Sequence, residues 1–337
     1  FKVKIYELKN INRFMKKILI TGGAGFIGSN LTKLFLKKNY FVTVFDKYNF
    51  QNNWGWLEEI KDNKKLTVKL GDIRDFDLID KLVKKNDEVI HLAALIGIPY
   101  SYESPLAYIK TNIEGTYNIL ESCRKNNNKN VIITSTSEVY GSSEFEPMRE
   151  DHPTKSQSPY AASKKSADEL SLSYHRSFNS KVKIIRPFNT FGPKQSARAV
   201  IPNIIFQLLN KKIKYVKLGN IYPRRDYTYV NDLCDAYFKI LNLKKYGEIF
   251  NVATAINYSI EDIYNKISKI VKIRKKIKIE NIRKRKSSSE VVSLRGDYSK
   301  IKLYTNWEPT TQFERGLKET IKWVKKNPQV FKDTYNI

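Results

Sequence analysis

The stretch Lys17-Ile-Leu-Ile-Thr-Gly-Gly-Ala-Gly-Phe-Ile-Gly-Ser29 joins an apolar run to a glycine-rich turn and the start of a helix. The apolar run is typical of a buried strand. Gly22, Gly25 and Gly28 allow a tight turn, close approach of a pyrophosphate to the backbone, and close packing of the helix on the strand. Because the first N–H groups and the dipole of a helix attract anions, this pattern predicts a dinucleotide site.

A second buried strand is predicted at Phe41–Phe45, and it ends in Asp46. An acidic residue at this place can accept a hydrogen bond from the adenine-ribose 2′-hydroxyl. Because Asp46 would repel a 2′-phosphate, the sequence favours NAD over NADP, although the adjacent Lys47 leaves NADP open. The aromatic and amide-rich segment Lys47–Trp56 is interpreted either as a packed surface loop or as a lid.

Strand and helix patterns alternate as far as residue 187. The alternation predicts an α/β fold with a Rossmann-like, doubly wound parallel sheet and right-handed crossovers. Ser104 and Ser158 each precede a proline and are predicted to cap long helices. The first of these helices is predicted to have one apolar face, formed by Leu106, Ile109, Ile113, Tyr117 and Leu120.

From about Asn189 the strict alternation fades. A loop is predicted at 189–193 and a polar, aromatic segment at 224–229. Further helices are predicted at 200–211 and 230–243, after a Ser259 cap, and near the C-terminus, with a short strand at 248–252.

The length of 337 residues allows a full core, with one large domain or a large and a small one. No apolar stretch is long enough for a membrane span, so a soluble cytoplasmic protein is expected. Residues 1–14, before Met15, are expected to be an extension outside the fold. Cys123 and Cys234 lie in helical patterns and are predicted to be reduced core residues, and no metal site is predicted.

The formal net charge of +27 raises the alternative of a basic nucleic-acid-binding protein with a Rossmann core. The lysines are spread along the whole chain, however, and the aromatic residues lie in apolar patterns. We therefore expect no nucleic-acid partner. A general attraction to anionic ligands such as nucleotide diphosphates follows in either case.

Polar or small residues follow several predicted strands, at the sheet edge where ligands of parallel sheets bind. Asp72 follows the third strand and could hydrogen-bond the adenine, and Ala93 would let the backbone pass close to the cofactor. The fifth strand ends in Ser135-Thr-Ser-Glu-Val-Tyr-Gly141, a catalytic candidate. In the next helix, the i,i+4 spacing places Tyr160 and Lys164 on one face.

Taken together, these motifs resemble those of the extended short-chain dehydrogenase/reductases that act on nucleotide sugars, from Met15 to the C-terminus. Within that family the chain looks most like the N-acetylglucosamine 4,6-dehydratases of the legionaminic-acid type pathway. The motifs are Thr21-Gly-Gly-Ala-Gly-Phe-Ile-Gly28, Asn53-Trp-Gly-Trp56, His91-Leu-Ala-Ala94, Ala94-Leu-Ile-Gly-Ile-Pro99, Ser135–Gly141, Tyr160-Ala-Ala-Ser-Lys164, Arg186–Pro202 and Arg225-Asp-Tyr-Thr-Tyr-Val230.

The resemblance implies an NAD-binding Rossmann domain at 15–188. It implies a smaller α/β lobe at 189–337 that mainly binds the nucleotide sugar, with segments near 230–255 returning to the Rossmann domain. It also implies a homodimer packed through the helices near 105–125 and 158–178. The implied NAD-binding residues are Gly22, Gly25, Phe26, Ile27, Gly28, Asp46, Asp72, Ile73, Ala93, Tyr160 and Lys164.

The implied reaction oxidises C4 of the sugar, eliminates water across C5 and C6, and returns the hydride to C6. Tyr160 would be the base at the C4 hydroxyl, with its pKa lowered by Lys164 and by the positive nicotinamide. Thr136 would hydrogen-bond the C4 oxygen. Glu138 would remove the C5 proton and then protonate the leaving C6 hydroxyl, because Ser137 stands where several dehydratases have an aspartic acid.

The same Thr-Ser-Glu sequence also resembles UDP-glucuronate decarboxylases, and a nucleotide-sugar 4-epimerase is a further alternative. A decarboxylase needs a cation near the sugar C6, for which Arg186 and Arg198 are candidates. At the nucleotide end, Asn189 and Arg225 match positions that contact the phosphate region of the substrate. Arg285, in the basic loop, is a further substrate-binding candidate.

Overall fold

The computed structural model describes residues 15–285 and 289–331. Its centre is a seven-stranded sheet in which every neighbouring pair is parallel, in the order β10-β6-β5-β4-β1-β2-β3. This confirms the predicted Rossmann-like fold. The strands are β1 (Lys17–Thr21), β2 (Phe41–Lys47), β3 (Leu66–Gly71), β4 (Glu88–His91), β5 (Asn130–Thr134), β6 (Val182–Pro187) and β10 (Glu248–Val252).

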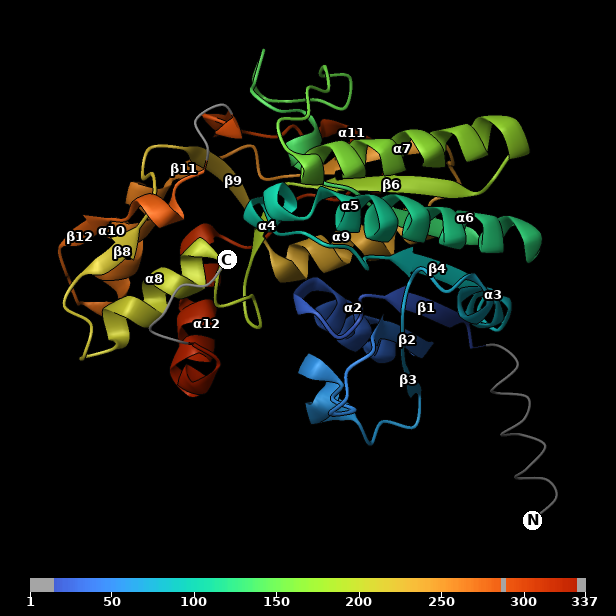
Figure 1. Cartoon of the computed structure of the whole chain (residues 1–337), viewed down its shortest axis with the longest axis horizontal. Helices are drawn as coiled ribbons and strands as arrows, with labels where there is room; N and C mark the ends of the chain where they lie inside the picture. The colour runs from blue at the N-terminus through green and yellow to red at the C-terminus, as the bar shows by residue number, and fades with distance from the viewer. Residues whose placement is uncertain (1–14, 286–288, 332–337) are drawn as a thin grey trace.

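Helices cover both faces of the sheet (Figure 1), because alternate strand residues point to opposite sides. In β1, Ile18 and Ile20 pack in the cluster that holds Leu31 of α2 and Leu233 of α9, whereas Leu19 packs in the cluster of α3 and α6. These helices are α2 (Phe26–Lys37), α3 (Phe76–Lys84), α6 (Gly115–Lys125), α7 (Pro159–Phe178) and α9 (Val230–Asn242).

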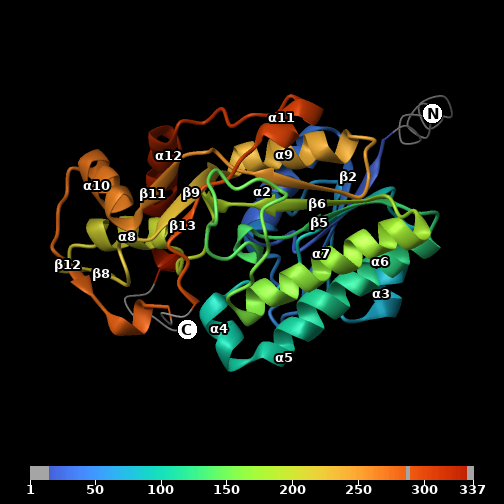
Figure 2. The same ribbon diagram turned by 90° about the horizontal axis from the view of Figure 1, so that it is seen from above.

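Helices α6 and α7 run side by side along one face of the molecule (Figure 2). The predicted long helix before α6 is divided into α5 (Pro105–Tyr108), a π-helical segment η2 (Ile109–Glu114) and α6 itself. Ser158 caps α7 by accepting a 3.1 Å hydrogen bond from the N–H of Ala161. Ser104 is the N-cap residue of α5, with Pro105 at the first helical position as predicted, although its side chain makes no capping hydrogen bond. The same residue also ends the short helix α4 (Ile98–Glu103).

The C-terminal part contains strands that the sequence did not predict. The expected loop at 189–193 contains β7 (Asn189–Phe191), and the segment at 224–229 is β9 (Arg224–Tyr229), which pairs with β7, β11 and β13. The other elements are α8 (Val200–Leu209), β8 (Val216–Leu218), β11 (Asn257–Ser259), α10 (Ile260–Val271), β12 (Ile277–Ile279), β13 (Ser293–Leu294), α11 (Ser299–Thr305) and α12 (Phe313–Lys326).

Local sequence signals account for several boundaries. Ser259 and Asp262 form the predicted capping box at the start of α10. Cys123 and Cys234 are buried free cysteines in α6 and α9, as predicted. The N-terminal residues 1–14 lie outside the described residues, so the expectation of an extension there stays a prediction. Among the described residues, no helix is long and apolar enough to cross a membrane.

Candidate active site

The glycine-rich turn packs tightly against the end of β4 and against its own helix. Gly22 has a φ of +71°, and a Cβ atom there would lie 2.8 Å from the backbone nitrogen of Ala93. A Cβ atom on Gly28 would lie 2.2 Å from the carbonyl oxygen of Gly22. Helix α2 starts at Phe26, and its N-cap residue Gly25 provides no side-chain hydrogen bond, so the first N–H groups of the helix are available to an anion.

Asp46 is fixed against this turn at the end of β2. One carboxylate oxygen accepts a 2.7 Å hydrogen bond from the N–H of Ala24, and the other accepts a 2.7 Å bond from the N–H of Lys47. Burial raises the pKa of Asp46, and these two hydrogen bonds oppose the rise. A carboxylate oxygen has more than one lone pair, so Asp46 can still accept a hydrogen bond from a ligand hydroxyl.

Two further predicted cofactor residues follow β3. Asp72 is partly exposed and forms an ion pair with Arg74, which lowers the pKa of Asp72 to about 2. Ile73 is buried, and it packs where a Cβ on Gly115 would lie, 2.9 Å from the nearest Ile73 atom. The end of β3 thus presents a charged, already paired carboxylate beside an apolar contact.

The segment after β2 packs over the glycine-rich turn. Its 3-10 helix η1 (Gly55–Ile60) places the N–H of Trp56 3.2 Å from the carbonyl oxygen of Ala24. The carbonyl of Trp56 accepts a 3.2 Å hydrogen bond from Lys194, and its ring contacts Trp323 edge to face with 5.3 Å between centroids. This part of the segment is therefore a packed connection to the C-terminal part of the chain.

His91 links the turn to the helices behind it. Its Nδ1 lies 2.7 Å from the Thr21 hydroxyl, and that hydroxyl accepts a hydrogen bond from the N–H of Ala93. On the other side of the ring, Nε2 lies 3.3 Å from the Thr116 hydroxyl, which donates to the carbonyl of Asn112. These partners assign the proton of a neutral His91 to Nε2. Burial lowers the pKa of His91 to about 3, and the charge of Lys164 lowers it further.

The predicted catalytic residues Thr136, Tyr160 and Lys164 come together from two elements. Tyr160 and Lys164 lie one turn apart near the start of α7, both buried, and Thr136 follows β5. Burial raises the pKa of Tyr160 and a hydrogen bond with Thr136 opposes the rise, so the lowered pKa predicted from Lys164 is not found in the protein alone. Burial also lowers the pKa of Lys164 to about 8, while Asp168 opposes that fall.

A buried network behind this group was not predicted from the sequence. Asp168, one turn beyond Lys164, accepts a 2.8 Å hydrogen bond from Ser135 and a 3.0 Å charged bond from Arg186. The Arg186 guanidinium lies 4.9 Å from the centre of the Tyr140 ring. Arg186 is therefore buried and paired with Asp168 inside the protein.

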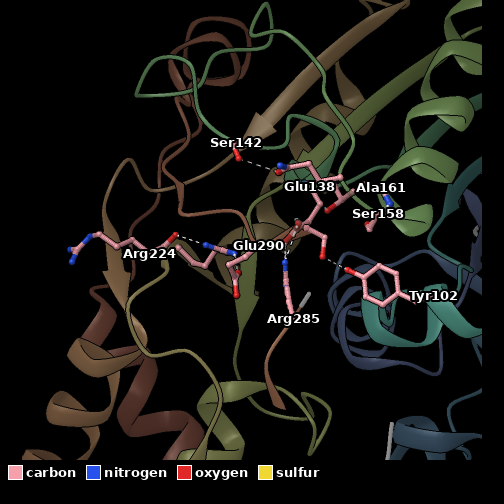
Figure 3. A network of polar contacts seen from close by, with 12 residues as sticks. Tyr102, Glu138, Ser142, Ser158, Ala161, Arg224, Arg285 and Glu290 are labelled. Carbon is pink, nitrogen blue, oxygen red and sulfur yellow. Dashed lines mark hydrogen bonds and ion pairs between the residues drawn. The ribbon is translucent and has the colours of Figure 1, made fainter. Parts of the chain in front are cut away.

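A second charged cluster borders the site (Figure 3). Arg285 contacts Glu138 with 3.3 Å between Nη1 and Oε1, and Arg225 contacts Glu290 with 3.4 Å between Nη2 and Oε1. Glu138 lies in the 3-10 turn η3 (Ser137–Val139) that follows Thr136. The structure thus brings Arg285 to the predicted base, a contact between residues 147 positions apart that sequence spacing does not reveal.

The remaining candidates lie in different surroundings. Ser137 is buried in η3, and Asn189 starts β7, where it pairs with Tyr227 of β9. Arg198 is exposed in the loop before α8. Among the described residues, its side chain makes no hydrogen bond or ion pair with the cluster around Glu138.

Known proteins share this architecture. The sequence profile described as GDP-mannose 4,6 dehydratase matches residues 19–320. The chain belongs to this family. Its members within the extended short-chain dehydrogenase/reductases include nucleotide-sugar dehydratases, epimerases and decarboxylases.

Relatives of the GDP-mannose 4,6 dehydratase family match most of the chain. The dTDP-D-glucose 4,6-dehydratase of Dictyostelium discoideum is 36% identical over 272 residues, which cover 76% of this chain and 62% of that protein. The UDP-N-acetyl-alpha-D-glucosaminuronate decarboxylase of Bacillus cytotoxicus is 33% identical, covering 91% and 97%. The structure of UDP-glucuronic acid 4-epimerase from Bacillus cereus, in complex with UDP-glucuronic acid and NAD, has a TM-score of 0.84 at 30% identity, covering 92% and 99%.

Proposed function

We propose that the protein is an NAD-dependent nucleotide-sugar 4,6-dehydratase, which converts UDP- or GDP-N-acetylglucosamine to the 4-keto-6-deoxy sugar. The observation that carries the proposal is the meeting of Thr136, Tyr160 and Lys164 from two elements, with Glu138 two residues beyond Thr136. Family membership supports the same class of chemistry. Residues 15–188 would mainly hold the cofactor, and residues 189–337 would mainly hold the nucleotide sugar.

The residues of the glycine-rich turn fit NAD. The available N–H groups at the start of α2, including those of Phe26 and Ile27, would bind the pyrophosphate, and Asp46 would accept from the adenine-ribose hydroxyl. Bound NAD supplies a hydride acceptor and a positive charge near the sugar. That charge is the further contribution that Tyr160 needs, since burial alone raises its pKa.

In this proposal each side chain moves or holds one proton. Tyr160 takes the proton of the C4 hydroxyl while Thr136 hydrogen-bonds the same oxygen. Once C4 is a ketone, the C5 proton becomes acidic, and Glu138 removes it and delivers it to the leaving C6 hydroxyl. Return of the hydride to C6, and of a proton to C5 that balances the one taken by Tyr160, would complete the 4-keto-6-deoxy sugar. Ser137 orients that hydroxyl, since a serine is too weak an acid to protonate it. Asn189 and Arg225 would hold the diphosphate.

The proposal is tested by mass spectrometry of the protein incubated separately with UDP-N-acetylglucosamine, GDP-N-acetylglucosamine and UDP-glucuronate, without added NADH. Loss of one water from an N-acetylglucosamine substrate is the expected result. Glu138→Gln should stop this loss, whereas the control Glu144→Gln, in a partly exposed ion pair with Lys155, should retain it. Water loss by Glu138→Gln at the wild-type rate would refute the role of Glu138.

A second candidate function, decarboxylation of a nucleotide-activated uronate, is supported by the contact of Arg285 with Glu138. A decarboxylase needs a cation near the C6 carboxylate, and Arg285 stands beside the residue proposed to face C5. Loss of carbon dioxide from UDP-glucuronate, abolished in Arg285→Met, would establish this function in place of dehydration. A 4-epimerase would instead give a product of unchanged mass.

We also propose a homodimer that packs through α5, α6 and α7. Leu106, Ile109 and Tyr117, from the predicted apolar face, have exposures of 60%, 51% and 44%, and Phe178 at the end of α7 is exposed by 52%. Exposed apolar side chains gathered on adjacent helices are typical of a protein interface. Light scattering should give twice the 39.4 kDa chain mass, and Leu106→Glu should reduce it.

A further inference from the structure

The Asp168 carboxylate is buried at a junction of three elements of the candidate active site. It is 1% exposed, it lies on α7 one turn beyond Lys164, and its Oδ2 accepts hydrogen bonds from Ser135 after β5 and from Arg186 on β6. Its Oδ1 has no hydrogen-bond partner among the described residues. A buried carboxylate with one oxygen lacking a hydrogen-bond partner destabilises the folded protein unless nearby positive charges compensate its charge.

Lys164 is one of these compensating charges. Residues four apart on a helix lie on the same face, with about 5–6 Å between their Cβ atoms. Both side chains are buried, so their charges interact with little screening from solvent. The attraction is mutual: Lys164 favours the charged form of Asp168, and Asp168 favours the charged form of Lys164.

Ser135 connects the same carboxylate to the other side of the site. The 2.8 Å bond from its hydroxyl to Asp168 holds the residue that directly precedes Thr136. The Thr136 side chain in turn acts on the Tyr160 hydroxyl, where it opposes the rise in the pKa of Tyr160 caused by burial. One carboxylate therefore contacts both the element that provides Thr136 and the helix that provides Tyr160 and Lys164.

We propose that Asp168 is a positioning residue of the candidate active site, which keeps Lys164 charged and fixes Thr136 relative to Tyr160. This inference rests on the proposed roles of Tyr160 and Lys164. Burial raises the pKa of Asp168, and the Arg186 guanidinium, which binds the carboxylate at 3.0 Å, opposes that rise and favours the charged form. Asp168 would act on the reaction only through its neighbours.

Other titratable groups face the same pair. The charge of Lys164 acts on His91 of β4, but burial lowers the pKa of His91 to about 3, so His91 is neutral near neutral pH. Burial raises the pKa of Tyr160 on the same helix, and the charge of Asp168 raises it further, so Tyr160 is protonated in the absence of a cationic ligand. Arg186 on β6 remains charged throughout the accessible pH range. Burial lowers the pKa of Lys164, and Asp168 is the charged neighbour that opposes that fall near neutral pH.

The test replaces Asp168 with asparagine, which keeps the shape and removes the charge. The lysine Cε atoms are labelled with carbon-13, and the resonance of Lys164 is identified by its absence in Lys164→Arg. We expect the titration midpoint of Lys164 to fall by about one pH unit in Asp168→Asn. The basic limb of the pH profile of kcat should fall by the same amount. Ser135→Ala, which removes a hydrogen bond but keeps the charge, should leave both midpoints in place.

Unchanged midpoints in a folded Asp168→Asn protein would overturn the inference, even if its thermal stability were lower. If Asp168→Asn does not fold, the double variant Asp168→Asn/Arg186→Gln replaces the ion pair by two neutral amides, and the midpoint should still fall. The titration needs no substrate. If the wild-type protein converts no nucleotide sugar, the proposed function fails while the NMR result still decides the effect of Asp168 on Lys164.

Discussion

Replacing Gly28 with alanine is expected to destabilise the protein. A Cβ atom at this position would lie 2.2 Å from the carbonyl oxygen of Gly22 and 2.6 Å from the Cα atom of Gly23. Both contacts are about 1 Å or more inside an ordinary van der Waals separation of roughly 3.5 Å. Both partners are backbone atoms, which cannot rotate away as a side chain can, so helix α2 must move away from the turn.

The magnitude follows from two opposing effects. Overpacking of this kind costs about 1–3 kcal/mol, and contact with backbone places Gly28→Ala at the upper end. Alanine is about 1 kcal/mol more favourable than glycine within a helix. We therefore expect the free energy of unfolding to fall by about 2 kcal/mol. If NAD requires the original turn, the same energy weakens its binding about 30-fold.

Gly25→Ala is the matched control within the same turn. A Cβ atom there would lie 3.4 Å from the carbonyl oxygen of Gly22, an ordinary contact, and the φ of Gly25 is −75°. Urea unfolding of the ligand-free proteins should show wild-type stability for Gly25→Ala and a lower free energy of unfolding for Gly28→Ala. Calorimetry should show whether the NAD affinity of Gly28→Ala falls with it. Equal stability of Gly28→Ala and the wild type would refute the packing of α2 on the turn.

Three further outcomes are expected. Tyr160→Phe should lower kcat by about 10²–10⁴-fold with little change in thermal stability, measured with the substrate identified by mass spectrometry, and near-normal turnover would remove Tyr160 from the mechanism. The folded-state pKa of His91, about 3, lies below its unfolded value near 6.5, so stability is lost as pH falls below 6.5. Urea unfolding between pH 6.5 and 4 should show a slope about 1.4 kcal/mol per pH unit smaller in His91→Gln, and an identical slope would contradict a neutral, buried His91. Lys183→Met should cost about 2–4 kcal/mol in urea unfolding, because the buried Lys183 amino group donates to the carbonyls of Leu241 and Leu243 at the end of α9, while NAD affinity should remain at the wild-type level.

The main sheet was predictable because its signals are local. Apolar runs such as Ile18–Ile20 are buried on both faces of a parallel sheet and stand out against the polar turns between them. The position of Ser158 before a proline and the pairing of Ser259 with Asp262 mark helix starts within a few residues. The spacing of Tyr160 and Lys164 identified one face of α7.

The unpredicted features depend on contacts between distant residues. The short strand β7 has no apolar run of its own, and it forms because its backbone pairs with β9 some 38 positions later, as at Asn189 and Tyr227. The ion pair of Arg285 with Glu138 spans 147 positions. The position of Asp168 could have been predicted from the sequence, because the i,i+4 spacing that places Tyr160 and Lys164 on one helix face also places Asp168 beside Lys164.

The packing of Trp56 bears on how long a cofactor stays in the protein. The backbone of Trp56 is held by Ala24 of the glycine-rich turn on one side and by Lys194 on the other, and its ring rests on Trp323. Release of a bound dinucleotide past this segment would require these contacts to separate. In a reaction that returns its hydride to the same substrate, nothing is gained by exchange. If the proposed reaction is correct, these contacts would favour a dinucleotide that stays bound as a prosthetic group over many turnovers.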